Sequence, residues 1–508
     1  MRTIRHHIDR RAARAPNRVY LVAPEPGRTV TFGQLQRESV NLCRFLACEG
    51  LQPGDKVATY LHNGLQTAAI FLGAMYGGYV PVPLNLLAQG AQLEYVLEHS
   101  DAKLVFTTAD QAARLAGLAQ ALHRPITVIV IDVDASSLFF EERLPRTRVD
   151  EPGESDPALL MYTSGTTGKP KGCVLTHANV VSGGLFVKAA HQLTERDRVL
   201  SSLPLYHING QIVATVGPLV QGGSVVCPHR LSVSRFWDLI AEHQCTWFNV
   251  VPTIISYLVS STTLEARTPE LSRVRFGRSA SAPLAPELHR AFERKFGISI
   301  IETFGMTETC APCFANPLDR PKRKYGSVGK PVGNVAKVVR RDGAECLQGQ
   351  VGELMVKGDN VMQGYYKSLE ETAQALEPDG WLHTGDLGYR DEDGDYFVTG
   401  RLKELIVKGG ENIAPREIDD ALFKHPAVLE AAAVGIPDRH YGQEILAGVV
   451  LKPGMRASET ELRAFCEKEL GRYKTPKVFC FLPELPKGPS GKVQRLKLAP
   501  LFEAPQGT

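Results

Sequence analysis

Residues 162–172 read YTSGTTGKPKG, and their types and spacing point to chemistry with phosphate groups. Five hydroxyl side chains, three glycines and two lysines stand together, with no acid among them. Glycines allow backbone N–H groups to turn toward an anion, while hydroxyls and lysines add donors and positive charge. The apolar run ALLMYT (158–163) predicts a strand before the loop, and Thr176 is a suitable N-cap for a helix after it. Strand, glycine-rich loop and helix together predict a phosphate-binding loop.

Two other interpretations of this stretch are weaker. A Gly/Ser/Thr cluster can be a plain surface turn, but the paired lysines and the preceding strand favour phosphate binding. The P-loop pattern G-x-x-x-x-G-K-[ST] is not matched, because Gly165 and Gly168 are too close and Pro170 stands where Ser or Thr is required. An ordinary P-loop kinase or ATPase is therefore disfavoured.

The elements that position this loop belong to a chain of 508 residues, which is too long for one simple core. Helical patterns alternate with short apolar strands through residue 300, which indicates α/β layering. Closely spaced strands with glycine turns follow from residue 326 to 399, and a compact α+β unit follows Gly400. We expect an α/β fold: a large N-terminal domain (1–400) of layered α/β subdomains plus a small β subdomain, then a small mobile α+β C-terminal domain (401–508).

Composition narrows the class of protein. A hydrophobic content of 43% and a charged content of 22% are typical of a soluble globular protein, and a net charge of +3 gives no argument for a nucleic-acid partner. Residues 65–93 carry no charge, but glycines and prolines interrupt them, which predicts a buried helix followed by a strand and no membrane span. The basic start predicts an amphipathic helix that ends near Pro16.

No apolar segment follows that start, so no secretory signal is visible and we expect a cytoplasmic protein with ten reduced cysteines. Cys310 and Cys313 form a CxxC without a second ligand pair, and we expect them to line an apolar region.

Beside the phosphate loop, the chain carries further motifs in a recognisable order. With them it resembles the adenylate-forming superfamily of acyl-CoA synthetases, peptide-synthetase adenylation domains and luciferases over nearly its whole length. The motifs are LPLYHING (203–210), ETFGMTE (302–308), HTGD (383–386), GRLKELIVKGGENIAPREI (400–418) and PKGPSGKVQR (486–495).

This resemblance implies an ATP site. The loop would hold the β- and γ-phosphates, Phe304 (where the family usually has tyrosine) would stack on adenine, and Asp386 would bind the ribose hydroxyls. Taken singly, Asp386 after Thr-Gly is more often a turn residue, and Arg401 a solvated charge. The implied ATP-binding residues are Thr163, Ser164, Gly165, Thr166, Thr167, Gly168, Lys169, Ser281, Ala282, Pro283, Thr303, Phe304, Gly305, Asp386 and Arg401.

The resemblance also implies catalytic residues and moving parts. Lys492 would reach the α-phosphate from the mobile domain, Thr307 would donate to it, and Glu308 would bind Mg²⁺. Lys403 would be the hinge. A tunnel for coenzyme A would involve Gly409, Gly410, Tyr441 and Lys474. Alone, Lys403 and Lys492 are ordinary exposed lysines.

The acid substrate is the least specified part. His207, which could also be a packed core residue, would border the acyl pocket as a catalytic residue. The expected pocket residues are His207, Asn249, Val250, Met306 and Cys310. Because the pocket segments contain no lysine or arginine, we expect an apolar aryl or medium-chain monocarboxylate in preference to oxalate or malonate, unless Arg278 reaches the pocket.

We therefore expect an ATP-dependent, Mg²⁺-dependent acid–CoA ligase that forms an acyl-adenylate and then a thioester. A carrier protein in place of CoA, a non-catalytic nucleotide-binding relative and, remotely, a luciferase are the alternatives. A homodimer is left open.

Overall fold

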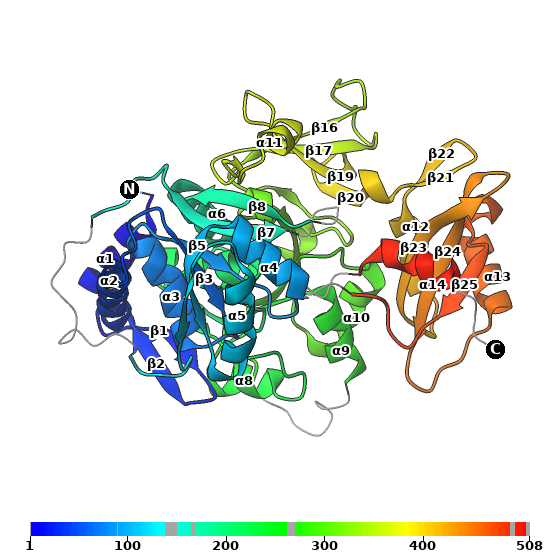
Figure 1. The fold of residues 1–508 in the computed structure, drawn as a ribbon. Coiled ribbons are helices and arrows are strands. Elements are labelled where there is room, and N and C mark those ends of the chain that lie inside the picture. Colours follow the sequence, from blue (N-terminus) through cyan, green and yellow to red (C-terminus); the bar gives the residue numbers. More distant parts are fainter. Residues whose placement is uncertain are drawn as a thin grey trace.

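The computed structural model of the chain describes residues 2–88, 90–137, 150–163, 169–261, 270–487 and 493–503. Within these ranges the chain forms a large N-terminal body, a small β subdomain and a C-terminal unit beside them (Figure 1). The expected α/β fold class is confirmed. None of the helices in these ranges is long and apolar enough to cross a membrane.

The largest sheet in the described part of the chain has nine strands and forms the base of the candidate site. Its middle strands run parallel, and β2, β14 and β15 pair antiparallel at the edges. In spatial order the strands are β15 (Lys330–Pro331), β14 (Ala311–Ala315), β13 (Ile300–Met306), β12 (Phe276–Ser279), β11 (Trp247–Val250), β9 (Arg198–Ser201), β10 (Ser224–Val226), β1 (Val19–Ala23) and β2 (Arg28–Thr31). Because spatial order differs from chain order, distant segments meet at the carboxyl ends of the parallel strands.

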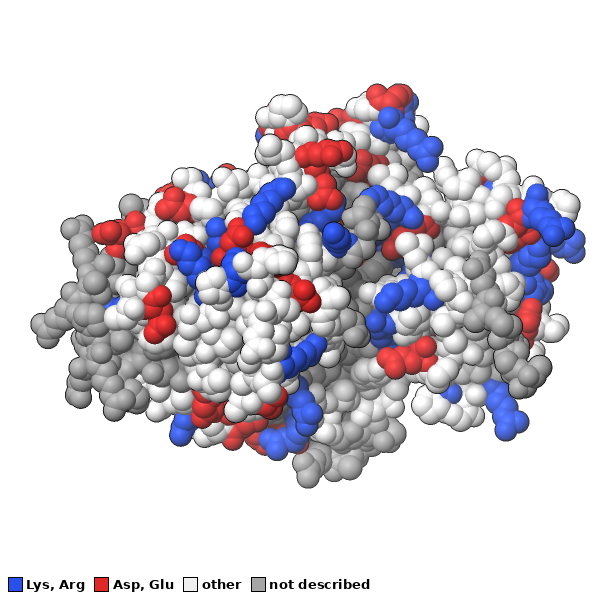
Figure 2. All heavy atoms as spheres, in the orientation of Figure 1, with Lys and Arg blue, Asp and Glu red and all other residues white. Residues whose placement is uncertain are grey.

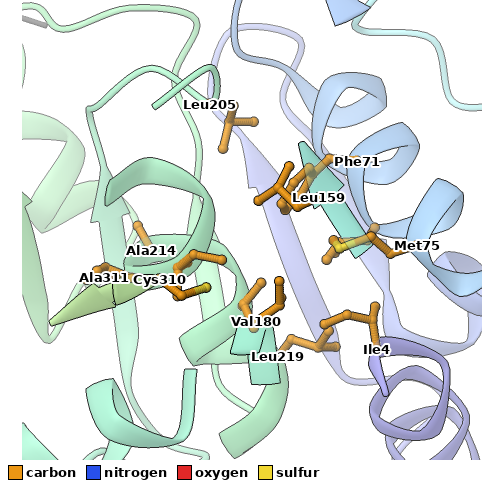
Figure 3. Close-up of a cluster of buried hydrophobic side chains, with 14 of the residues drawn as sticks. Ile4, Phe71, Met75, Leu159, Val180, Leu205, Ala214, Leu219, Cys310 and Ala311 are labelled. Carbon is orange, nitrogen blue, oxygen red and sulfur yellow. The ribbon is translucent and has the colours of Figure 1, made fainter. Parts of the chain in front are cut away.

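Helices pack on both faces of this sheet, since its strands point apolar side chains alternately to each face. On one face Leu200 and Phe248 contribute to a core with the first group of helices, and on the other Val199 and Trp247 join the second group. The first group is α8 (Phe236–Glu242), α9 (Pro252–Ser260) and α10 (Pro286–Phe296); the second is α6 (His177–Ala190), the π-helix η2 (Asn209–Val216) and α7 (Gly217–Gln221). Figure 3 shows side chains of the second core.

A smaller parallel sheet completes the N-terminal body. Its strands, in spatial order, are β4 (Val80–Pro83), β3 (Lys56–Tyr60), β5 (Ala102–Thr107) and β6 (Thr127–Val130). The uncharged stretch forms the buried helix α3 (Leu65–Tyr76) and then β4, as predicted. The remaining helices here are α1 (Ile4–Arg14), α2 (Phe32–Cys48), α4 (Gly90–His99) and α5 (Ala109–Ala121). Helix α1 ends before Pro16, which also matches the sequence prediction.

One sequence prediction about the phosphate loop was wrong. The strand before it is β7 (Pro157–Thr163), but the loop leads into a second strand, β8 (Lys171–Thr176), before α6 begins. β8 pairs with β7 and with β18 (Gly364–Tyr365), so the loop joins a hairpin and no helix follows it directly. The predicted N-cap is correct, because Thr176 Oγ1 accepts a hydrogen bond from Asn179 N at 3.2 Å.

The β subdomain is an antiparallel sheet, and the C-terminal unit is a mixed sheet with helices. The subdomain has β16 (Val335–Val339), β17 (Gly352–Lys357), β19 (Leu382–Arg390) and β20 (Tyr396–Arg401), with α11 (Leu369–Ala375) nearby. The C-terminal elements are β21 (Ile406–Lys408), β22 (Glu411–Ile413), α12 (Pro415–Phe423), β23 (Val428–Asp438), β24 (Gly442–Leu451), α13 (Glu459–Leu470), β25 (Val478–Phe481) and α14 (Leu498–Glu503). On the face drawn in Figure 2, acidic and basic side chains are interspersed.

Candidate active site

The candidate ribose residues form an ion pair across neighbouring strands. Asp386 on β19 is directly opposite Arg401 on β20 in the register of the sheet. Arg401 Nε donates to Asp386 Oδ1 at 2.9 Å, and the carboxylate is 4% exposed. The charge of Asp386 raises the pKa of Arg401 above its ordinary value. The two residues that the sequence placed on one sugar therefore lie together.

The candidate magnesium residue belongs to a second group of polar side chains. Glu308 is buried, and Tyr365 Oη donates to its Oε1 at 2.9 Å. Lys171 Nζ lies 5.2 Å from the centroid of the Tyr365 ring and 2.7 Å from Glu371 Oε1. Burial and then the charge of Glu308 raise the pKa of Tyr365. Sequence reasoning missed Tyr365, because this residue reaches Glu308 from a strand 57 residues further along the chain.

The donor set around Glu308 fits Mg²⁺ held mainly by a nucleotide. Mg²⁺ prefers oxygen ligands and is commonly bound by one or two carboxylates together with substrate phosphates and water. Among the described residues no group of three or more His, Cys, Asp or Glu side chains could hold a metal. A single carboxylate suits that arrangement, and Tyr365 connects Glu308 to Lys171 at the end of the phosphate loop. Cys310 and Cys313 are fully buried, and burial raises the pKa of the Cys313 thiol to about 12.

The expected adenine wall lies between β12 and β13. Ser281, which has a positive φ of 72°, begins the segment Ser281-Ala282-Pro283, and Phe304 on β13 is half-buried. A Cβ on Gly305 would lie 2.6 Å from Ala311 O, so glycine allows β13 and β14 to approach closely. Thr303 Oγ1 is buried with no hydrogen-bond partner among the described residues.

Glu302 is a residue of this wall that sequence reasoning missed. Its Oε1 accepts a hydrogen bond from Leu284 N at 3.0 Å, while Oε2 is buried without a partner in the described ranges. Burial raises its pKa to about 7, against an opposing effect of the positive charge of Arg416 on α12. Glu302 is therefore sensitive to the position of the C-terminal unit.

A buried arginine, Arg278, lies beside Asn249, which is one of the residues expected in the acyl pocket. Arg278 on β12 is 2% exposed, and its Nη1 donates to Asn209 Oδ1 at 2.7 Å and to Asn249 Oδ1 at 2.9 Å. Asn249 Nδ2 donates to Asn209 Oδ1 at 2.9 Å, and Asn209 Nδ2 donates to Ser281 Oγ at 3.1 Å. The signal in the sequence was an arginine in a strand that otherwise carries small and apolar residues, FGRS.

The other predicted pocket residues lie in different surroundings. Val250 packs into the core with α8 to α10, on the opposite face of β11 from Asn249, so the structure does not bring it to the polar cluster. Cys310 lies in the other core, beside Val180 and Ala214 (Figure 3). Met306 is half-buried, and the half-buried His207 ring lies 4.7 Å from that of Tyr206.

The residue expected as the hinge and the glycine pair expected at the CoA tunnel lie at the start of the C-terminal unit. Lys403 is exposed in the 3₁₀ turn Leu402–Glu404, directly after β20. Gly409 and Gly410 form the turn between β21 and β22, with φ of 54° and 87°. Gly409 N donates to Tyr441 O at 2.8 Å, which brings Tyr441 to this turn. The fourth residue, Lys474, forms an ion pair with Glu417 on α12.

Two parts of the predicted site lie outside the described residues: 164–168 of the phosphate loop, and Lys492. The loop ends are described, with Thr163 half-buried at the end of β7 and Lys169 Nζ 5.6 Å from the centroid of the Tyr95 ring.

Comparison with known families agrees with this geometry. The family model "AMP-binding enzyme" matches residues 8–366, and "AMP-binding enzyme C-terminal domain" matches residues 417–492. The chain belongs to the AMP-binding enzymes, in the branch of the adenylate-forming acyl-CoA ligases.

Several individual relatives are similar to this chain over most of its length. The chain is 54% identical to sulfoacetate–CoA ligase of Cupriavidus necator over 493 residues, 96% of each chain. It is 36% identical to oxalate–CoA ligase of Arabidopsis thaliana over 468 residues, 90% of each chain. ATP-bound MatB from Rhodopseudomonas palustris is 29% identical with a TM-score of 0.90, and apo MatB gives 0.79; each match covers 98% of this chain and 99% of that chain.

Proposed function

We propose that this ATP-dependent acid–CoA ligase acts on a short acid with a second anionic group, and that sulfoacetate is the first candidate. The reaction class follows from the family and from relatives that match nearly the whole chain. The observation that carries the residue roles is the Asp386–Arg401 pair, which belongs to the same part of the molecule as Glu308, since both acids raise the pKa of Arg401. The second anionic group is supported by relatives whose names give sulfoacetate and oxalate as substrates.

In the first half-reaction a carboxylate oxygen of the acid attacks the α-phosphorus of ATP, and pyrophosphate leaves. A free carboxylate is a poor acyl donor because oxide would have to leave, whereas AMP is a stable leaving group. Asp386 and Arg401 would hold the ribose, and Thr307 and Lys492 would donate to the α-phosphate. Mg²⁺ at Glu308 would neutralise charge on the departing pyrophosphate.

In the second half-reaction the sulfur of CoA attacks the acyl carbon. A C–S bond forms, the bond from the acyl carbon to the AMP oxygen breaks with its electron pair on oxygen, and the thiol proton passes to solvent. Rotation at Lys403 would bring the Gly409–Gly410 turn to the acyl-adenylate in this step.

A panel of acids, assayed for pyrophosphate release with and without CoA, tests this proposal. We expect sulfoacetate, oxalate or malonate to be turned over faster than acetate, hexanoate or benzoate, with AMP and the acyl-CoA identified by mass spectrometry. Fastest turnover of hexanoate or benzoate would return the substrate to the apolar class. Thioester formed on a phosphopantetheinylated carrier protein but not on CoA would refute CoA as acceptor.

A further inference from the structure

The polar cluster of Arg278, Asn209 and Asn249 lies between the main sheet and η2, where the surrounding side chains are largely apolar. Asn249 and Arg278 are opposite each other on the neighbouring strands β11 and β12, and Asn209 begins η2. All three side chains are buried. Three segments far apart in the sequence thus converge on one guanidinium.

The charge of this guanidinium is not balanced within the described residues. Its partners are two neutral amide oxygens, no ion pair reaches it there, and its Nε is buried without a hydrogen bond. Burial lowers the pKa of Arg278 only to about 9, so the group is still cationic at neutral pH. Burial also lowers the pKa of nearby His191, which is therefore neutral. An unpaired buried charge is costly, and a bound anion would offset that cost.

The guanidinium is connected through Asn209 to the expected adenine wall. Asn209 accepts from Arg278 and donates to Ser281, which begins the expected adenine wall. The guanidinium is therefore separated from that wall by one bridging side chain. The buried cation is thus linked to the wall expected beside the nucleotide, where the acid must lie to react with ATP.

We infer that Arg278 binds the second anionic group of the substrate, a sulfonate or carboxylate, and that Asn209 and Asn249 are positioning residues that hold the guanidinium toward it. The inference rests on the proposed function. Arg278 offers several N–H donors in one plane, which suits an oxyanion with several acceptor oxygens. A purely structural role, in which Arg278 only ties η2 to β11 and β12, is the competing explanation.

The test compares two acids of similar shape and different charge, sulfoacetate and 3,3-dimethylbutanoate, by ATP–pyrophosphate exchange. Arg278→Met should lower kcat/KM for sulfoacetate by about 10²–10³, while that for 3,3-dimethylbutanoate is kept or rises. Arg275→Met is the matched control, because Arg275 is paired with Asp197 at 2.6 Å and should leave the preference unchanged. The inference would be overturned if Arg278→Met lost activity on both acids to the same extent, or if it kept the preference for sulfoacetate.

Asn249→Asp keeps the test valid if Arg278→Met does not fold. The new carboxylate would lie where Oδ1 now accepts from Arg278 at 2.9 Å, so it would neutralise the guanidinium from within the protein. We expect it to lower activity on sulfoacetate while sparing 3,3-dimethylbutanoate. Lower activity on both acids alike would indicate a structural role and contradict the inference.

Two outcomes separate this inference from the proposed function. If the wild type prefers 3,3-dimethylbutanoate, the protein is still an acid–CoA ligase, but the inference of an anion site at Arg278 is refuted. If the wild type activates neither these two acids nor oxalate or malonate, the proposed function fails, and thermal shift with sulfoacetate decides the anion site. The anion site is supported if sulfoacetate raises the melting temperature of the wild type and of Arg275→Met but not that of Arg278→Met or Asn249→Asp. Equal shifts in melting temperature for all four proteins would refute the anion site.

Discussion

Glu302 makes the stability of the fold depend on pH. Its pKa rises from the ordinary 4.5 to about 7 through burial, opposed by Arg416 and reinforced by Asp420. Between these values the folded protein keeps a proton that the unfolded chain has lost. The contribution of this carboxyl to stability is therefore full below pH 4.5 and is lost as the pH rises through 7. The loss is on the order of 3 kcal/mol, since one pKa unit is worth about 1.4 kcal/mol.

Glu302→Gln should remove this dependence. We expect the free energy of unfolding, from urea titrations at pH 5.5 and 8.5, to fall less with pH in the variant than in the wild type. Glu287→Gln is the control, because Glu287 is on the outside of α10 and pairs with Arg290. Equal pH dependence in the wild type and Glu302→Gln would contradict the assignment.

Site residues that belong to a recognisable motif could be predicted from the sequence. Site residues that are brought together only by the packing of distant strands could not. Asp386 and Arg401 are 15 residues apart and lie within recognisable motifs. Arg278, Asn209 and Tyr365 acquire partners only through the order of the strands, which the sequence does not display. The alternation of side chains along a strand could have shown that Asn249 and Val250 do not share a pocket, because neighbouring residues in a strand face opposite sides of the sheet.

At the scale of elements, the expected hinge at Lys403 leads to a testable prediction. Lys403 follows β20 directly and its side chain is exposed, and a proline there would fix φ at the proposed pivot. Lys403→Pro should slow thioester formation at least tenfold, the order of effect expected when a gating motion is blocked, and leave adenylation largely intact. Single-turnover assays of each half-reaction measure this.

Two variants serve as comparisons for the hinge. Lys403→Ala removes the charge but keeps backbone rotation, and should behave like the wild type. Lys492→Ala should show the opposite pattern, with adenylation slowed by about 10²–10³ through loss of a preorganised charge, and conversion of a presynthesised acyl-adenylate spared. If Lys403→Pro performs both half-reactions at the wild-type rate, Lys403 is not the pivot.

Element types were largely predictable, because periodicity and capping are local. The uncharged stretch 65–93 contains α3 and then β4 as predicted, and Thr176 caps α6 as expected. β8 was missed because its identity depends on pairing with β7 and β18, which are supplied by other parts of the chain. Propensity alone does not report such partners.

At the scale of the whole molecule, the structure is more similar to ATP-bound MatB than to apo MatB. The structure matches ATP-bound MatB with a TM-score of 0.90 and apo MatB with 0.79, although both are the same protein. In this structure α10 of the N-terminal body contacts α12 of the C-terminal unit.

Hydrogen–deuterium exchange can follow this contact. Amides of α10 and α12 should exchange several-fold faster when CoA and an unreactive acyl-adenylate analogue are added together, because rotation at the hinge would separate the helices. Helix α3, buried in the N-terminal body, is the internal control and should not change. Unchanged exchange in α10 and α12 would argue against rotation.

The pairing of Asp386 with Arg401 also limits how genes for this enzyme can change in length. The two residues lie on a hairpin whose turn, at 391–394, is tied down by Lys324 through ion pairs with Asp391 and Asp393. An inserted codon within either strand would move one partner to the other face of the sheet, whereas an inserted codon in the turn would not. We expect inherited insertions and deletions in this lineage to collect in the turn, while the strands keep their length.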